Sequence, residues 1–188
     1  MSAFTDVPAD AFDRFVDATA LAWIVPHVAP ASALLMPVVR DAQPGRLLGH
    51  LPKRHPAALA LARNSRAQLL LLGPHGVVTS TVAGTADWAP TWNFVSASIE
   101  ADLKLDDTLT ERALEATVAH LDPAWNAAAL GARHAKLMAR VIGFSAEIVT
   151  AHPRFKLGQD EHPEVRARIA AHFAETPLGA WMARHASA

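Results

Sequence analysis

Three short segments of the sequence combine residue types that could bind a planar or anionic ligand. Residues 49–56 (Gly-His-Leu-Pro-Lys-Arg-His-Pro) place two adjacent cations before an expected helix, and backbone N–H groups at a helix N-terminus favour a phosphate. Residues 73–75 (Gly-Pro-His) follow a run of four leucines. In residues 88–94, Trp92 could pack beside a planar ring while the Asn93 amide binds its polar edge. Each segment also has a structural interpretation, as a basic turn, a strand end and a pair of core tryptophans.

Several other kinds of chemistry are excluded by the residues that the chain lacks. It has no cysteine, which rules out disulfides, thiolate catalysis and cysteine-based zinc sites. It also lacks a Gly-rich dinucleotide fingerprint, a phosphate-binding loop ending in Gly-Lys-Ser/Thr, and a Gly-x-Ser-x-Gly elbow. The sequence holds ten histidines but no His-Glu-x-x-His motif, so no metal site is predicted.

The composition is that of an ordinary folded protein. With 188 residues, of which 51% are hydrophobic and 19% charged, we expect one domain over residues 1–188. No apolar run approaches the roughly 20 residues that span a bilayer, and the first residues do not resemble a secretory signal. We therefore expect a cytoplasmic protein without membrane contact. The net charge of −1 argues against direct binding of duplex DNA. The densest basic stretch, Lys53-Arg54 with Arg63 and Arg66 nearby, is large enough for one phosphate.

The strands that would carry these segments are predicted from hydrophobic alternation and turn residues. Residues 95–103 alternate strictly between apolar and polar positions, and within residues 141–149 Ile142, Phe144, Ala146 and Ile148 alternate with Gly143, Ser145 and Glu147. Residues 33–36 and 46–50 flank the turn-forming residues 41–45 and are expected to form a hairpin. Residues 68–72 suit a buried strand that ends at Gly73-Pro74. Further strand residues are expected in the long connection that follows, at Val77–Thr79.

Helices are predicted around these strands. The expected helices cover residues 8–20, 56–67, a segment after Thr108, residues 126–140, and two C-terminal segments that begin at Pro163 and Pro177. Thr108 and Glu111 have the spacing of a capping box, and Leu114, Val118 and Leu121 would form the buried stripe of that helix. The order of elements favours an α+β fold with a mostly antiparallel sheet or barrel and a helical segment over about 160–188.

Taken in order, the motifs resemble those of the PaiB-type FMN-binding negative transcriptional regulators. The resemblance runs from about Leu35 to Gln159. The matching motifs are Gly49-His50-Leu51, His55-Pro56, Gly73-Pro74-His75, Pro90-Thr91-Trp92-Asn93-Phe94, Ile142-Gly143-Phe144 and Phe155-Lys156-Leu157-Gly158-Gln159-Asp160. Each motif alone is weak, but their shared order makes a chance resemblance improbable.

This resemblance implies a split β-barrel like that of pyridoxamine-phosphate oxidases and flavin reductases, and a homodimer with FMN at the subunit interface. It implies a flavin-dependent regulator or an FMN-dependent oxidoreductase such as a flavin reductase. His50, Lys53 and Arg54 would lie near the phosphate or the ribityl chain. Trp92 and Asn93 would lie near the ring or the interface. The remaining cofactor-binding candidates are His55, His75, Lys156 and Gln159.

The chain also departs from the family pattern at positions that could hold a flavin. It contains no tyrosine, Val77 replaces the tyrosine of the Gly-Pro-His motif, and Gly158 replaces a serine. Two alternatives therefore stay open. One is a flavin-free split barrel that binds haem, pyridoxal phosphate or another planar or anionic ligand, with His50 or His75 as candidate haem ligands. The other is a transcriptional regulator that acts through DNA or a partner protein.

Overall fold

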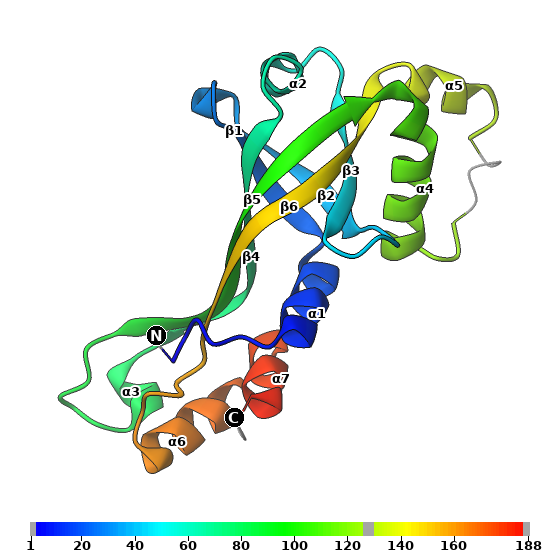
Figure 1. Ribbon diagram of the computed structural model, residues 1–188. Helices are drawn as coiled ribbons and strands as arrows, with labels where there is room; N and C mark the ends of the chain where they lie inside the picture. Colours follow the sequence, from blue (N-terminus) through cyan, green and yellow to red (C-terminus); the bar gives the residue numbers. More distant parts are fainter. Residues whose placement is uncertain (1–2, 126–129, 186–188) are drawn as a thin grey trace. The chain divides into compact units, whose positions relative to one another are not determined.

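The fold is built around a closed barrel of six strands in the order β1-β2-β3-β6-β5-β4 (Figure 1). The computed structural model describes residues 3–125 and 130–185. The pairs β1–β2, β1–β4, β2–β3 and β3–β6 are all antiparallel, which confirms the predicted α+β barrel. The strands are β1 Leu21–Pro26, β2 Leu34–Arg40, β3 Arg46–Pro52, β4 Arg66–Val78, β5 Thr91–Asp106 and β6 Val141–Lys156.

Seven helices and two 3-10 turns accompany the strands in the described part of the chain. They are α1 Ala9–Thr19, η1 Pro30–Ser32, α2 Pro56–Leu61, α3 Ser80–Ala83, η2 Asp107–Leu109, α4 Thr110–Leu121, α5 Ala132–Met138, α6 Pro163–Phe173 and α7 Pro177–Arg184. The helix expected over residues 126–140 begins in a stretch, 126–129, that lies outside the described residues. Among the helices that the structure describes, none has both the length and the apolar character needed to span a membrane.

The chain divides into two compact units. We call residues 16–71 and 98–151 the barrel unit, because they include β1, β2, β3 and most of the barrel. We call residues 1–15, 72–97 and 152–188 the helical unit, because they include α3, α6 and α7. The strands β4, β5 and β6 contribute residues to both units. The expectation of a single domain over the whole chain stays a prediction.

The barrel unit encloses an apolar core to which every strand contributes. Alternate residues of β5, including Ile99, Ala101 and Leu103, are almost fully buried, as their alternation with polar residues predicts. At Gly143, a Cβ atom would lie 2.7 Å from the backbone of Leu109 and Thr110. Only glycine therefore lets the start of α4 approach β6 this closely, and the Gly143 N–H donates to Thr110 Oγ1 over 2.9 Å.

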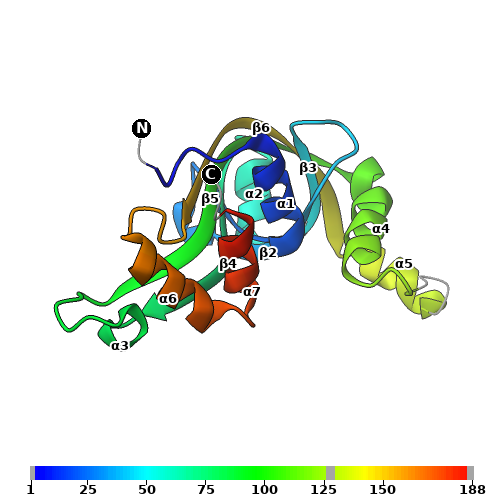
Figure 2. The same ribbon diagram turned by 90° about the horizontal axis from the view of Figure 1, so that it is seen from below.

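The helical unit is held together by aromatic rings and by a tight helix–helix contact. Phe155 packs edge-on against Phe15 and Trp181, with ring centroids 5.6 and 5.4 Å apart. Helices α3, α6 and α7 lie together (Figure 2). A Cβ atom at Gly179 would fall 1.9 Å from the carbonyl oxygen of Phe173, so the packing of α7 on the end of α6 requires glycine.

Two strand predictions need correction. The strand expected to end at Gly73-Pro74 continues through them to Val78 as β4. Strand β1 pairs only with residues 67–70 of β4, so Pro74 lies beyond that paired stretch and its missing N–H costs no bond to β1. Strand β1 itself was not predicted at all. Its outward-facing residues Leu21 and Trp23 are apolar although exposed, which hides the alternation.

The helix predictions also need correction. Helix α2 ends at Leu61, because the chain enters β4 at Arg66. The capping box at Thr108 is wrong: the Asp106 carboxylate accepts the Thr108 N–H over 2.7 Å and begins η2 instead. In α4 the buried face consists of Thr110, Ala113 and Thr117, while Leu121 is 60% exposed. The small residues face inward because α4 lies close to β2 and β3.

Candidate functional site

An exposed pair of aromatic rings lies in the helical unit. His75 of β4 and Trp92 of β5 have ring centroids 5.8 Å apart at an angle of 45°. Trp92 is 52% exposed and His75 is also exposed. The Nδ1 atom of His75 lies 3.0 Å from the carbonyl oxygen of Gly73, which fixes the orientation of the ring. Together the two rings offer a partly solvent-facing aromatic surface on which a planar ligand can stack.

The neighbouring residue on β5, Asn93, points inward. It is 2% exposed, and its Nδ2 atom is buried without a hydrogen-bond partner among the described residues. The same atom is 3.5 Å from the position that a Cβ at Gly158 would occupy. Gly158 has φ of +80°, in the left-handed region that favours glycine. An unsatisfied buried donor costs about 1–3 kcal/mol, and the Asn93 amide has the capacity to donate one hydrogen bond that the described residues do not use.

Charged groups gather at the end of β6 in the same unit. Lys156 Nζ donates to Thr91 Oγ1 over 2.8 Å, and Thr91 lies two positions before Asn93 on β5. Burial raises the pKa of Glu161, the nearby Asp160 charge raises it further, and Lys156 partly opposes the shift. Lys156, Glu161 and Asn93 therefore contribute an ammonium, a carboxyl group and a buried amide to the helical unit. Thr91 and Glu161 were not singled out from the sequence, although Thr91 stands in the Pro-Thr-Trp-Asn motif.

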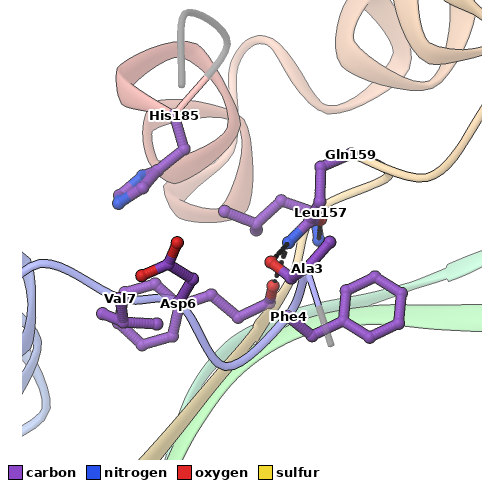
Figure 3. Close-up of a pocket in the computed structure, with 8 residues that line it drawn as sticks. Ala3, Phe4, Asp6, Val7, Leu157, Gln159 and His185 are labelled. Carbon is purple, nitrogen blue, oxygen red and sulfur yellow. Dashed lines mark hydrogen bonds between the residues drawn. The ribbon is translucent and has the colours of Figure 1, made fainter. Parts of the chain in front are cut away.

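Gln159 has structural partners on both sides of its amide. Its Nε2 atom donates to the carbonyl oxygens of Phe155 and Ala3, over 2.5 and 3.2 Å. Its Oε1 atom accepts the Leu157 N–H over 2.7 Å. The side chain thus fastens the N-terminal segment to the end of β6 (Figure 3). Its predicted contact with a cofactor stays a prediction.

The barrel unit holds the other four predicted residues, two of which are histidines. His50 lies on β3 as the register partner of Gly143. Its Nδ1 atom is buried without a hydrogen-bond partner among the described residues. Burial lowers the pKa of this imidazole, so the ring is neutral at pH 7. His55 caps α2, because its Nδ1 atom accepts the Ala57 N–H over 3.2 Å.

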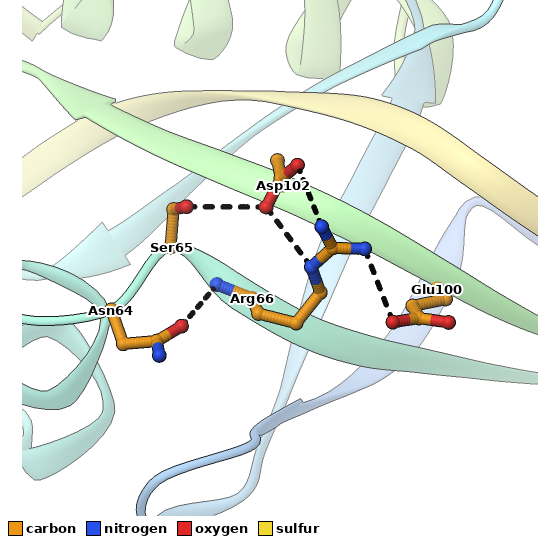
Figure 4. Close-up of polar contacts among 5 residues, drawn as sticks. All are labelled: Asn64, Ser65, Arg66, Glu100 and Asp102. Carbon is orange, nitrogen blue, oxygen red and sulfur yellow. Dashed lines mark hydrogen bonds and ion pairs between the residues drawn. The ribbon is translucent and has the colours of Figure 1, made fainter.

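The basic stretch predicted for a phosphate is partly neutralised. Lys53 Nζ lies 2.7 Å from Asp107 Oδ1. Arg66 lies 3.1 Å from both Glu100 Oε1 and Asp102 Oδ1, and Ser65 donates to the same Asp102 carboxylate (Figure 4). Of the four cations in this stretch, Arg54 and Arg63 are the two without an ion pair among the described residues.

The nine predicted residues therefore fall into two groups, one in each unit. His75, Trp92, Asn93, Lys156 and Gln159 belong to the helical unit. His50, Lys53, Arg54 and His55 belong to the barrel unit. Two of the three buried polar side-chain atoms without a partner in the described chain belong to this predicted set, at His50 and Asn93. No group of three metal-ligating side chains occurs within residues 3–125 and 130–185.

A comparison with protein families matches residues 1–150 to the family described as "Putative FMN-binding domain". This match covers most of the chain, so the protein belongs to that family of FMN-binding domains. The cofactor that the family indicates is FMN, as the motifs predict. The match identifies the FMN-binding domain and does not single out the PaiB-type regulators. A search of curated proteins finds no match.

Solved structures confirm the split-barrel fold. The FAD and heme binding protein from Mycobacterium smegmatis is 20% identical with a TM-score of 0.66, over 88% of this chain and 78% of that one. The flavocytochrome Anf3 from Azotobacter vinelandii is 20% identical with a TM-score of 0.65, over 85% and 73%. The heme storage protein HutZ from Vibrio cholerae is 11% identical with a TM-score of 0.50, over 83% and 99%.

Proposed function

We propose that this protein is an FMN-dependent oxidoreductase of the flavin-reductase type that works as a homodimer. Two observations carry the proposal within a family of FMN-binding domains: the buried, unpartnered amide of Asn93 on the inner face of β5, and the exposed ring of Trp92 on its outer face. A flavin presents both features that such a pair can use, a planar ring system and polar ring atoms that accept hydrogen bonds.

The described residues suggest how the cofactor would be held. Asn93 Nδ2 and Lys156 Nζ would donate to the polar edge of the flavin. Trp92 and His75 point outward from the opposite face, so in the proposed homodimer they would pack against the flavin held by the other subunit. Within the barrel unit, Arg54 has no ion pair in the described chain and is therefore a stronger candidate for an anionic group than Lys53, which is bound to Asp107. When bound, FMN supplies the hydride and electron transfer. The protein contributes positioning and a cation that stabilises negative charge on the ring.

The homodimer is supported by an exposed apolar face on the barrel unit. Trp23 of β1 is directly paired with Leu35 of β2 and with Leu70 of β4. These residues and Leu21 are 40–49% exposed, although large apolar patches are uncommon on free protein surfaces. A second copy of the chain could cover this face symmetrically, since an isologous contact uses the same patch on both subunits.

An oxidoreductase agrees with the charges better than a DNA-binding regulator does. The net charge is −1, and Lys53 and Arg66 are neutralised by carboxylates. A duplex footprint needs several free cations on one surface. A salt-dependent shift of duplex DNA by the purified protein would favour the regulator instead.

Haem binding is the second candidate function, because the three structural neighbours described above bear names that include heme or a flavocytochrome. His75 suits a haem ligand better than His50 does. Its Nδ1 atom faces the Gly73 carbonyl, which leaves Nε2 for a metal in the arrangement usual for ligating histidines. Haem titration of the wild type and of two variants tests this. The variants are His75→Ala and, as a control at another exposed histidine, His152→Ala. A Soret band lost only in His75→Ala would support it, and no band in the wild type would refute it.

The visible spectrum and an FMN titration test the primary proposal. We expect FMN to bind, and to stabilise the fold by about 2.7 kcal/mol at a hundred times its Kd. Trp92→Ala should weaken binding, whereas Trp125→Ala, which removes another exposed tryptophan, should leave it unchanged. Anaerobic bleaching of the bound flavin by NADH or NADPH would support a reductase. A colourless protein that FMN does not stabilise would refute the flavin proposal.

A further inference from the structure

A pocket of about 250 Å³ lies in the helical unit where the N-terminal segment crosses the end of β6 (Figure 3). The Phe155 N–H donates to the carbonyl oxygen of Phe4 over 2.9 Å, and Gln159 holds Ala3 as described above. These bonds keep the segment in place as one wall. The pocket is lined by Ala3, Phe4, Asp6, Val7, Phe155, Leu157, Gln159 and His185.

His185 is fixed in this pocket with one ring nitrogen left as an acceptor. Its Nδ1 atom is 2.9 Å from the carbonyl oxygen of Trp181. A carbonyl can only accept a hydrogen bond, so Nδ1 carries the proton of the neutral ring and Nε2 carries the lone pair. The ring stacks on Trp181 with centroids 5.7 Å apart and meets Phe155 edge-on at 5.6 Å. Arg166 also donates to the backbone oxygen of His185, over 3.1 Å.

Asp6 supplies a second acceptor. Figure 3 shows its carboxylate on the same side of the pocket as the His185 ring. Within the described residues, the Asp6 carboxylate makes no hydrogen bond or ion pair. The other polar side chain, Gln159, has its amide bound to backbone groups. Among residues 3–125 and 130–185, the side chains at the polar end of the pocket therefore offer acceptors and a negative charge, but no free donor.

We propose that this pocket binds a small organic cation, an amidinium or ammonium group on an apolar body. Asp6 and His185 Nε2 would accept hydrogen bonds from the N–H groups of this cation. Its apolar part would lie against Phe4, Val7 and Leu157. Among the described lining residues, an anion would find no free side-chain donor, and a metal ion would find only Asp6 and His185 as ligands.

Three probes of nearly the same shape and different charge test this proposal: benzamidine, neutral benzamide and anionic benzoate. Binding to the full-length protein is followed by calorimetry and by NMR, with and without FMN. We expect benzamidine to bind, benzamide to bind about tenfold more weakly because it lacks the charge-assisted bond, and benzoate not to bind. Asp6→Asn and His185→Phe should each weaken benzamidine binding about tenfold. Asp160→Asn, which removes an exposed carboxylate outside the pocket, should change nothing.

The outcome is separable from that of the flavin proposal. An FMN titration of Asp6→Asn should match that of the wild type, because Asp6 is not among the residues assigned to the flavin. Thermal melting shows whether each variant is folded. Asp6 precedes α1 and His185 follows α7, so the two pocket variants alter different parts of the fold. Equal binding of benzamidine and benzamide, or unchanged benzamidine binding in a folded Asp6→Asn variant, would overturn the cation site. Failure of FMN to bind would leave this result unaffected.

Discussion

Replacement of Asn93 by leucine should make the free protein more stable and its flavin complex weaker. The Asn93 side chain is 2% exposed, and its Nδ2 atom has no partner in the described chain. Leucine has nearly the same shape and needs no hydrogen bond. The substitution therefore removes the desolvation cost of an unsatisfied donor, about 1–3 kcal/mol. In a protein of this size, each kcal/mol corresponds to a rise in Tm of about 2–4 °C.

The effect on FMN affinity has the opposite sign. If Asn93 donates to the flavin, Asn93→Leu loses one hydrogen bond to the cofactor, and a loss of about 1.4 kcal/mol weakens binding tenfold. Thermal melts without FMN and at a fixed excess of FMN measure both effects on one instrument. The variant should melt above the wild type without FMN and should gain less than the wild type from added FMN.

Thr19→Val is the matched control for this experiment. Thr19 Oγ1 is the third buried polar atom without a partner in the described chain, and valine has the shape of threonine without the hydroxyl group. This variant should also stabilise the free protein, but FMN affinity should stay the same. If Asn93→Leu lowers stability and leaves FMN affinity unchanged, then Asn93 serves the fold and the assignment of the flavin site is wrong.

Three further substitutions probe other parts of the structure. Trp23→Glu places a charge on the exposed apolar face of the barrel unit, so light scattering should show the proposed dimer for the wild type and a folded monomer for the variant; an unchanged mass would locate the interface elsewhere. Gly179→Ala forces a methyl group onto the carbonyl of Phe173 and should lower the free energy of unfolding by about 1–3 kcal/mol, as denaturant titration can measure. Burial lowers the pKa of His50 from its ordinary 6.5, so the unfolded state binds a proton more readily than the folded state. The free energy of unfolding is therefore unaffected above pH 6.5, and it falls by at most about 1.4 kcal/mol per pH unit as the pH drops below 6.5. The Tm of His50→Phe should accordingly fall less than that of the wild type between pH 7.5 and 5.5, and parallel curves would contradict this.

The strands differ in how well the sequence predicts them, and the reason lies in their two faces. On β5, buried residues such as Ile99 and Leu103 alternate with polar Ser98, Glu100 and Asp102, so periodicity finds the strand. On β1, the exposed face is also apolar, as expected for a surface that another molecule covers. Such a strand has no alternation to detect. The strand that carries the exposed apolar face was therefore the one that periodicity could not reveal.

The segments that form the candidate site could be predicted from the sequence, but the contacts between their residues could not. The order of the motifs brought Trp92, Asn93 and Lys156 to attention, and the structure places all three in the helical unit. Ion pairs between residues that are far apart in the sequence could not be predicted. Arg66 and Glu100, for example, are separated by 34 positions, and nothing local in the sequence indicates that β4 will bring that guanidinium to the carboxylates of β5.

The strands shared by the two units limit how this protein can be divided or altered. The chain passes from one unit to the other after Phe15, Leu71, Ala97 and Ala151, and the last three of these points lie within β4, β5 and β6. Neither unit is a continuous stretch of sequence, so neither can be gained, lost or expressed alone by a single cut. A one-residue insertion in any of these strands would reverse the facing of every side chain on one side of it. We therefore expect both units to be inherited together, with changes in length confined to the loops.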